Sequence, residues 1–220
     1  MTAVALGVDA IGFVFYENSP RYVDVALAKQ LRRLLPSFVS AVGLFVNADQ
    51  QVIRATQLAV GLDVLQLHGD ESPEFADTIG VDTARPWWRA VRCRDVGDLM
   101  HAKNAFSGAQ AWLIDSYSPQ FGGSGETFDW SLLRDVGFDP QKLIMSGGLD
   151  SSNVGVAIRG FNPRAVDVSS GIQIHTENRS SVDKSVSVSD ARQKDPKRME
   201  QFVQAVYDAR SSALIQTNSR

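Results

Sequence analysis

Short apolar runs alternate with amphipathic stretches along most of this 220-residue chain. The apolar runs are rich in β-branched and aromatic residues and hold few polar positions, which is typical of strands buried on both faces. Seven such runs predict strands: Ala10–Phe15, Val39–Val46, Val64–Leu67, Trp87–Val91, Ala111–Ile114, Leu143–Met145 and Ala165–Val168.

An amphipathic stretch follows each predicted strand. In one of them Leu27, Leu31 and Leu34 share a helical face, and another opens with Ser72 and Pro73, a typical helix start. The predicted helices are Val25–Leu35, Ala48–Ala59, Ser72–Ile79, Asp95–Phe106, Asp129–Val136, Ser151–Ile158 and Pro196–Arg210. Strand followed by helix, repeated along the chain, indicates parallel βα units.

An open doubly wound sheet can hold seven βα units, whereas a closed (βα)8 barrel needs eight. The first residues favour the barrel, because Thr2–Leu6 resembles the end of a helix that Gly7 stops, and such a helix implies an earlier strand. We expect an α/β fold, a (βα)8 TIM barrel with strand 1 and most of helix 1 missing from this chain, and a true start upstream. Residues 1–220 are expected to form a single domain, with 173–194 a flexible insertion before the last helix and 211–220 a frayed tail.

Composition narrows the class of protein. Hydrophobic residues make up 44% and charged residues 21% of the chain, and the formal net charge is −3. These values suit a soluble domain with a sizeable core and argue against a nucleic-acid partner. Cys93 is the single cysteine, which excludes a disulfide framework and fits a reducing compartment. With no membrane-length apolar run and no secretory signal, we expect a cytoplasmic protein without a membrane partner.

The strand that ends in Asp115 is the strongest candidate for chemistry. A glycine-rich loop with Gly122 and Gly123 follows it, and Asp129 stands where the N-cap of the next helix belongs. Catalytic groups of barrels lie at the carboxyl ends of strands, and a glycine loop can close over them. We predict that Asp115 acts beneath this loop and that the two glycines approach the ligand. The alternative is a surface turn whose aspartate caps a local group.

Two glycine-containing loops follow the last two predicted strands. Backbone N–H groups of such loops bind phosphate, and in many barrels this occurs after the seventh and eighth strands. The predicted phosphate-binding residues are Gly147, Gly148, Ser169, Ser170 and Gly171. Two ordinary glycine turns are the alternative.

Further polar residues follow other strands. Arg21 offers a guanidinium suited to a carboxylate, although it could be a solvated surface arginine. Gln66 and His68 alternate with leucines and therefore share one side of their strand, as ligand contacts or as a structural polar pair. Asp167 lies at the mouth of the predicted barrel. The three histidines are scattered along the chain, so we expect no metal site.

Together these motifs resemble the phosphoribosylanthranilate isomerase family. The matching segments occur in the family's order and are Gly7–Phe15, Ser19–Tyr22, Val42–Asn47, Leu65–Gly69, Leu113–Asp115, Phe121–Trp130, Ser146–Leu149 and Ala165–Gly171. The resemblance implies a TIM barrel that carries out an Amadori rearrangement in tryptophan biosynthesis without a cofactor. It also implies a small-molecule substrate and a monomer or homodimer.

The resemblance implies roles for single residues as well. Asp115 matches the family's general acid, and Arg21 matches the residue that holds the anthranilate carboxylate. The five residues of the two glycine loops match the phosphate cradle, and Asp167 is expected to orient the substrate. Gln66, His68, Gly122 and Gly123 are expected to contact the substrate.

The chain departs from the family at the general base, a cysteine in a Lys-Ile-Cys-Gly motif on the first strand. That motif is absent, and Cys93 is no equivalent. One alternative is therefore a truncated, inactive barrel that still binds a phosphosugar. Two other phosphosugar barrels fit less well, because a ribulose-phosphate epimerase needs metal ligands and an indoleglycerol-phosphate synthase needs a lysine acid and a longer N-terminal segment.

Overall fold

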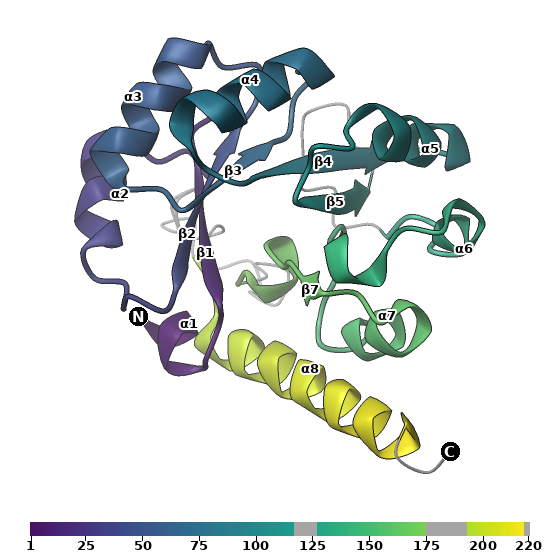
Figure 1. The fold of residues 1–220 in the computed structure, drawn as a ribbon. Coiled ribbons are helices and arrows are strands. Elements are labelled where there is room, and N and C mark those ends of the chain that lie inside the picture. Colours follow the sequence, from purple (N-terminus) through teal and green to yellow (C-terminus); the bar gives the residue numbers. More distant parts are fainter. Residues whose placement is uncertain (117–126, 175–192, 218–220) are drawn as a thin grey trace, which may run out of the picture.

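A computed structural model describes residues 1–116, 127–174 and 193–217, in which seven parallel strands form one sheet in chain order. The sheet curls into an open barrel, as Figure 1 shows. Its strands are β1 (Ala10–Val14), β2 (Ser40–Phe45), β3 (Val64–Leu67), β4 (Trp87–Cys93), β5 (Ala111–Ser116), β6 (Leu143–Met145) and β7 (Ala165–Val166). The prediction of seven parallel βα units of a TIM-type barrel is confirmed.

Helices cover the outer face of the sheet (Figure 1). They are α1 (Thr2–Ala5), α2 (Val25–Arg32), α3 (Gln50–Val60), α4 (Pro73–Thr83), α5 (Val96–Ala105), α6 (Leu132–Val136), α7 (Val154–Phe161) and α8 (Pro196–Thr217). Two 3-10 turns, η1 (Pro140–Lys142) and η2 (Ser170–Ile172), complete the described elements. Within those elements, no helix is both long enough and apolar enough to cross a membrane.

Local sequence signals account for several helix ends. The hydroxyl of Ser72 accepts a hydrogen bond from the Phe75 N–H, and Pro73 occupies the first turn of α4, as the sequence predicts. Gly7 follows α1 with a φ of +85°, a left-handed conformation that glycine adopts without strain and that ends a helix.

The bounds of all seven predicted helices differ from the observed ones at one or both ends, and two of these differences have a local cause. α6 begins at Leu132 and not at Asp129, because the Asp129 carboxylate accepts the N–H of Ser131 in a turn that precedes the helix. α8 continues past Arg210 to Thr217, into the predicted tail, since no glycine or proline interrupts that stretch.

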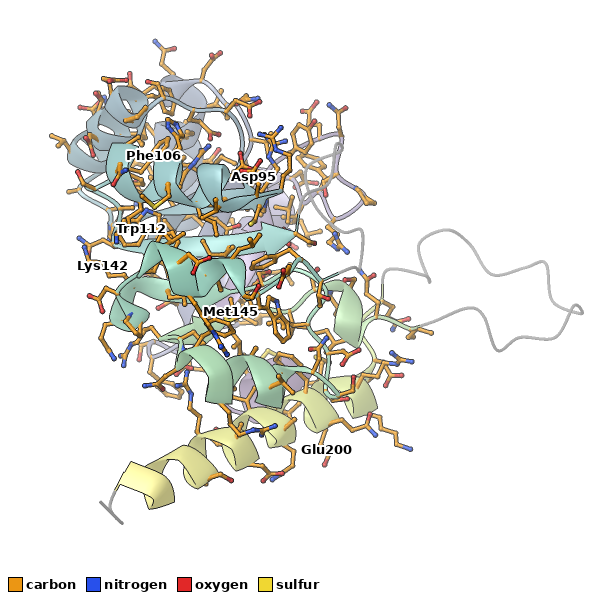
Figure 2. The ribbon with its side chains drawn as sticks, turned by 90° about the vertical axis from the view of Figure 1, so that its right-hand side faces the viewer. Asp95, Phe106, Trp112, Lys142, Met145 and Glu200 are labelled. Atoms are coloured by element: carbon orange, nitrogen blue, oxygen red, sulfur yellow. The ribbon has the colours of Figure 1, made fainter. Side chains whose placement is uncertain are left out.

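The side chains of the sheet form two layers. Residues that point outward pack against the helices; Trp112, for example, donates its indole N–H to the Ala102 carbonyl of α5 at 3.3 Å and lies beside Lys142 (Figure 2). Residues that point inward build a smaller apolar cluster made of Trp88, Ala90, Ala111, Leu113, Ile144 and Ala165. This inner cluster forms a floor inside the curled sheet.

β1 and β7 are the two edges of the sheet, and α8 packs against α1 and α7 beside them. The apolar face predicted for α2 remains partly exposed, with Leu27, Leu31 and Leu34 at 45%, 39% and 56%. α2 follows the edge strand β1 and contacts α3 as its neighbouring helix.

Candidate active site

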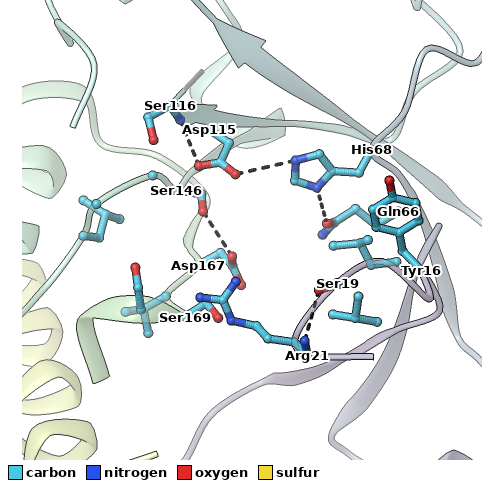
Figure 3. Close-up of a pocket in the computed structure, with 17 residues that line it drawn as sticks. Tyr16, Ser19, Arg21, Gln66, His68, Asp115, Ser116, Ser146, Asp167 and Ser169 are labelled. Atoms are coloured by element: carbon cyan, nitrogen blue, oxygen red, sulfur yellow. Dashed lines mark hydrogen bonds and ion pairs between the residues drawn. The ribbon is translucent and has the colours of Figure 1, made fainter. Parts of the chain in front are cut away.

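A polar layer lies directly above the apolar floor, at the carboxyl ends of the strands. Because side chains alternate across a strand, Asp115 points to the same side as the floor residue Leu113. The register places Arg92 beside Asp115. The layer borders a pocket of about 100 Å³ (Figure 3). Its polar lining comprises Tyr16, Ser19, Arg21, Gln66, His68, Asp115, Ser116, Ser146, Asp167, Ser169 and Ser170.

Three of these side chains form a row from β3 to β5. The Nδ1 atom of His68 lies 3.2 Å from Oε1 of Gln66, and its Nε2 atom lies 3.5 Å from Oδ2 of Asp115. Burial, reinforced by Arg89 and Arg92, lowers the pKa of His68 to about 4, so its ring is neutral at pH 7. With the Gln66 oxygen as acceptor, Nδ1 carries the ring proton and Nε2 turns a lone pair toward Asp115.

Asp115 is buried beside another acid. Burial and the charge of Asp167 raise the pKa of Asp115 to about 6, against the opposing effects of the Ser116 N–H at 2.8 Å and of Arg21. A carboxyl group with such a pKa is protonated in a useful fraction near neutral pH. The arrangement of Asp115 and a neutral His68 can therefore hold and release a proton inside the pocket.

The opposite wall combines an acid with a guanidinium. Asp167 accepts a hydrogen bond from the Ser146 hydroxyl at 3.1 Å, and burial raises the pKa of its carboxyl group. The guanidinium of Arg21 points into the pocket beside Asp167 and Ser169 (Figure 3). Ser19 holds the preceding turn by accepting the Arg21 backbone N–H at 3.1 Å.

The two glycine loops lie against one another. Gly147 and Gly148 have φ values of +72° and +65°, which favour glycine. A Cβ atom at Gly147 would lie 2.3 Å from the Ser116 nitrogen, and one at Gly171 would lie 2.0 Å from the Leu149 carbonyl oxygen. Both glycines are therefore required by close backbone approach. Gly147 approaches the end of β5 at Ser116, and Gly171 approaches the loop after β6 at Leu149.

The structure thus gathers most of the residues predicted from the sequence. Arg21, Gln66, His68, Asp115 and Asp167 line one pocket together with Gly147, Gly148, Ser169 and Ser170, whereas Gly171 is not in the lining and approaches the Leu149 carbonyl. Gly122 and Gly123 lie outside the described residues, as does most of the predicted 173–194 insertion.

Cys93 lies apart from this pocket. It belongs to the outward-facing core on β4, its thiol donates to the Asp95 carbonyl at 3.7 Å, and burial raises its pKa to about 12. Because this thiol stays protonated at neutral pH, it is a poor base. Cys93 is therefore no equivalent of the family's catalytic cysteine.

Sequence reasoning assigned no role to four polar residues that line the pocket, Tyr16, Ser19, Ser116 and Ser146, or to Lys194 beside it. In the Ser146–Leu149 motif the sequence predicts a binding role only for the two glycines. Lys194 donates to the carbonyl and hydroxyl oxygens of Ser169 at 2.6 and 3.1 Å. The end of the preceding strand is the one sequence signal that points to Ser146 as a site residue. No local sequence signal marks Lys194.

A curled parallel sheet with acids and glycine loops at its carboxyl end defines a TIM-barrel enzyme with a phosphosugar-type site. The chain belongs to the N-(5'-phosphoribosyl)anthranilate isomerase family, whose sequence model matches residues 1–176.

Similar proteins agree with this assignment. The chain is 48% identical over 171 residues to the N-(5'-phosphoribosyl)anthranilate isomerase of Methylibium petroleiphilum, covering 78% of each chain. It is 47% identical over 174 residues to that of Pseudomonas putida strain W619, covering 79% of this chain and 82% of the relative. Phosphoribosyl anthranilate isomerase from Thermotoga maritima superposes with a TM-score of 0.78 at 35% identity, over 94% of this chain and 92% of that one. A structure of such an isomerase in complex with reduced 1-(o-carboxyphenylamino)-1-deoxyribulose 5-phosphate gives a TM-score of 0.74 at 32% identity, over 94% and 91%.

Proposed function

We propose that the protein is an isomerase that converts N-(5-phosphoribosyl)anthranilate into 1-(2-carboxyphenylamino)-1-deoxyribulose 5-phosphate in L-tryptophan biosynthesis. Family membership and relatives named for this reaction support the assignment. The observation that carries it to this chain is the buried Asp115, with its raised pKa, beside the neutral ring of His68. The inactive, binding-only alternative finds no support in these comparisons.

Asp115 is the proposed general acid. Its proton goes to the furanose ring oxygen, the bond from that oxygen to C1' breaks, and the anthranilate nitrogen donates its lone pair to form an iminium. Loss of the C2' proton then gives an enolamine, which ketonises at C2' when C1' is protonated. Every step is a proton transfer or an electron-pair shift within the substrate, so the reaction needs no cofactor.

The substrate carries two anionic groups that the pocket can hold separately. The Arg21 guanidinium suits the planar anthranilate carboxylate. The loops of Gly147–Gly148 and Ser169–Gly171 suit the phosphate, since their glycines permit close approach of backbone N–H groups. Asp167 is proposed to orient the sugar hydroxyls, and Gln66 contacts the substrate beside His68.

The group that removes the C2' proton is not among the residues assigned above. The family's Lys-Ile-Cys-Gly motif is absent from the sequence, and Cys93 lies on the outer face of the sheet with a raised pKa. We assign the acid and the binding groups to residues of this chain and assign no residue to the base.

The direct test is an isomerase assay that follows the loss of substrate fluorescence, with the substrate generated in situ. The unextended chain is compared with an extended version that carries the first strand of the Methylibium petroleiphilum relative. Both proteins are also assayed with the Asp115→Asn change. Asp115→Asn should lower kcat by roughly 10²–10⁴-fold. Asp135→Asn, a change of the same chemistry at an exposed site on α6, should leave the rate unchanged.

Binding of the reduced product analogue, measured by calorimetry, separates catalysis from recognition. Binding without turnover in the unextended chain, with turnover in the extended one, would show that only the base is missing. Absence of both binding and turnover from both versions would refute the proposed function. Light scattering would decide between monomer and homodimer, and cell fractionation would test the proposed cytoplasmic location.

A further inference from the structure

Lys194 lies immediately behind the proposed phosphate loop. Its ammonium group donates to the Ser169 carbonyl oxygen at 2.6 Å and to the Ser169 hydroxyl oxygen at 3.1 Å. Ser169 lines the pocket, whereas Lys194 comes from the chain that returns just before α8. A residue distant in sequence is thereby attached to the wall of the substrate site.

The backbone on both sides of Lys194 determines its position. The Ile174 N–H donates to the Gln193 carbonyl at 3.0 Å, and the Asp195 N–H donates to the Ile172 carbonyl at 2.8 Å. Gln173 and Lys194 form an antiparallel bridge between these two bonds. Ile172 ends η2, the turn that begins at Ser170, so Lys194 is held by the same segment that forms the phosphate loop.

Within the described residues, the charge of Lys194 has no counter-ion at ion-pair distance, since none of the ion pairs within 4.0 Å involves this ammonium. Burial and the neighbouring charge of Arg21 lower its pKa to about 8, against the opposing charge of Asp167. A partly buried cation without a carboxylate partner is unfavourable, and an anion bound nearby would relieve that cost.

The hydrogen bonds also orient the Ser169 hydroxyl. Because its oxygen accepts from Lys194, its own proton is available to another acceptor, and Ser169 borders the pocket. An ammonium has three donors, of which Ser169 takes two. Among the described residues neither the Ser169 hydroxyl proton nor the Lys194 charge is taken up by an acid, and both suit the oxygens of a phosphate.

We infer that Lys194 is a substrate-binding residue that supplies the positive charge for the phosphate group, acting on it with and through Ser169. This inference rests on the proposed function and adds a cation to a cradle otherwise built from glycines and serines. Arg21, whose guanidinium also lies beside Ser169, is proposed to bind the anthranilate carboxylate, so each anionic group of the substrate has its own cation.

The test measures binding of inorganic phosphate by calorimetry to the full chain and to three variants. Lys194→Gln should weaken phosphate binding by about tenfold or more, as expected for loss of a charged hydrogen-bond donor. Lys194→Arg should retain most of the affinity. Lys197→Gln removes the same charge from an exposed position on α8 and should change nothing. Equal phosphate affinity in folded Lys194→Gln and the unaltered chain would overturn the inference, as would failure of arginine to rescue.

Binding of anthranilate to the same variants is the control that separates a role in phosphate binding from a structural role. It should be unchanged in Lys194→Gln, whereas a merely structural role for Lys194 would weaken both ligands together. Because neither measurement depends on turnover, failure of this inference is distinguishable from failure of the isomerase assignment.

A second measurement applies if Lys194→Gln does not fold. In the unaltered chain, phosphate affinity should fall as pH rises through about 8, because the ammonium loses its proton there. The charged groups that act on Lys194 are Arg21 and Asp167, and both remain in Lys194→Arg. The arginine variant should keep its affinity to higher pH. Parallel pH dependence in the two proteins would refute the role of Lys194.

Discussion

Replacing Asp115 with asparagine should stabilise the fold at neutral pH while it lowers kcat by roughly 10²–10⁴-fold. The pKa of Asp115 is raised from 3.8 to about 6, so its ionised form is disfavoured in the folded protein. A shift of about two units corresponds to about 3 kcal/mol at 1.36 kcal/mol per unit. Asparagine keeps an oxygen for the Ser116 N–H and adds an amide donor that faces the His68 lone pair. At pH 7 the Asp115→Asn protein should therefore be more stable by up to about 3 kcal/mol.

The expected difference in stability between the two proteins depends on pH. Well below pH 3.8 the Asp115 carboxyl is protonated in both folded and unfolded chains, so aspartate and asparagine should give similar stability there. As pH rises from about 4 to about 6, the unfolded chain ionises first and the original protein loses stability that the variant keeps. The gap should be constant above about pH 7.

His68 acts in the opposite direction over nearly the same range. Its pKa is lowered from 6.5 to about 4, so stability is lost as pH falls through that interval. In the original chain the two slopes partly cancel, and in the Asp115→Asn protein the His68 slope should stand alone.

Urea unfolding followed by fluorescence, repeated from pH 4 to 8, measures both effects. Glu74→Gln at a fully exposed helix site is a matched control that should show no such gain. A loss of stability in Asp115→Asn at pH 7, or a gain that does not change with pH, would refute the reasoning.

Three other predictions concern a glycine of a pocket loop, a buried ion pair and the single cysteine. Gly147→Ala should destabilise by roughly 1–3 kcal/mol and reduce ligand binding, because the added carbon would meet the backbone at 2.3 Å in a left-handed conformation; calorimetric melting and analogue titration check this. Arg89→Met should cost about 3–5 kcal/mol in urea unfolding, since it leaves the buried Glu71 without its guanidinium partner at 2.9 Å; an unchanged midpoint would contradict that account. Cys93→Ser should leave the isomerase rate within about twofold in the same fluorescence assay, because the thiol lies outside the pocket; a large loss of kcat with the fold intact would reopen its role as base.

The sequence by itself determined the order of strands and helices and most of the site. Short continuous apolar runs rich in β-branched and aromatic residues are typical of strands covered on both faces, so the parallel βα plan followed from local pattern. The position of Asp115 and of the glycine loops followed too, because parallel strands bring their carboxyl ends to one side. The helix that was predicted to begin at Asp129 starts at Leu132, since a short polar turn competes with the first helical bonds.

Tertiary structure alone decided the properties that depend on distant neighbours. The raised pKa of Asp115 requires burial beside Asp167, and the neutral state of His68 requires burial near Arg89 and Arg92. The attachment of Lys194 to Ser169 joins residues 25 positions apart, on either side of a Ser-rich stretch with no periodic pattern. Local sequence sets backbone preference and the side to which a residue points, but the electrostatic environment of a buried group is the sum over every segment folded around it.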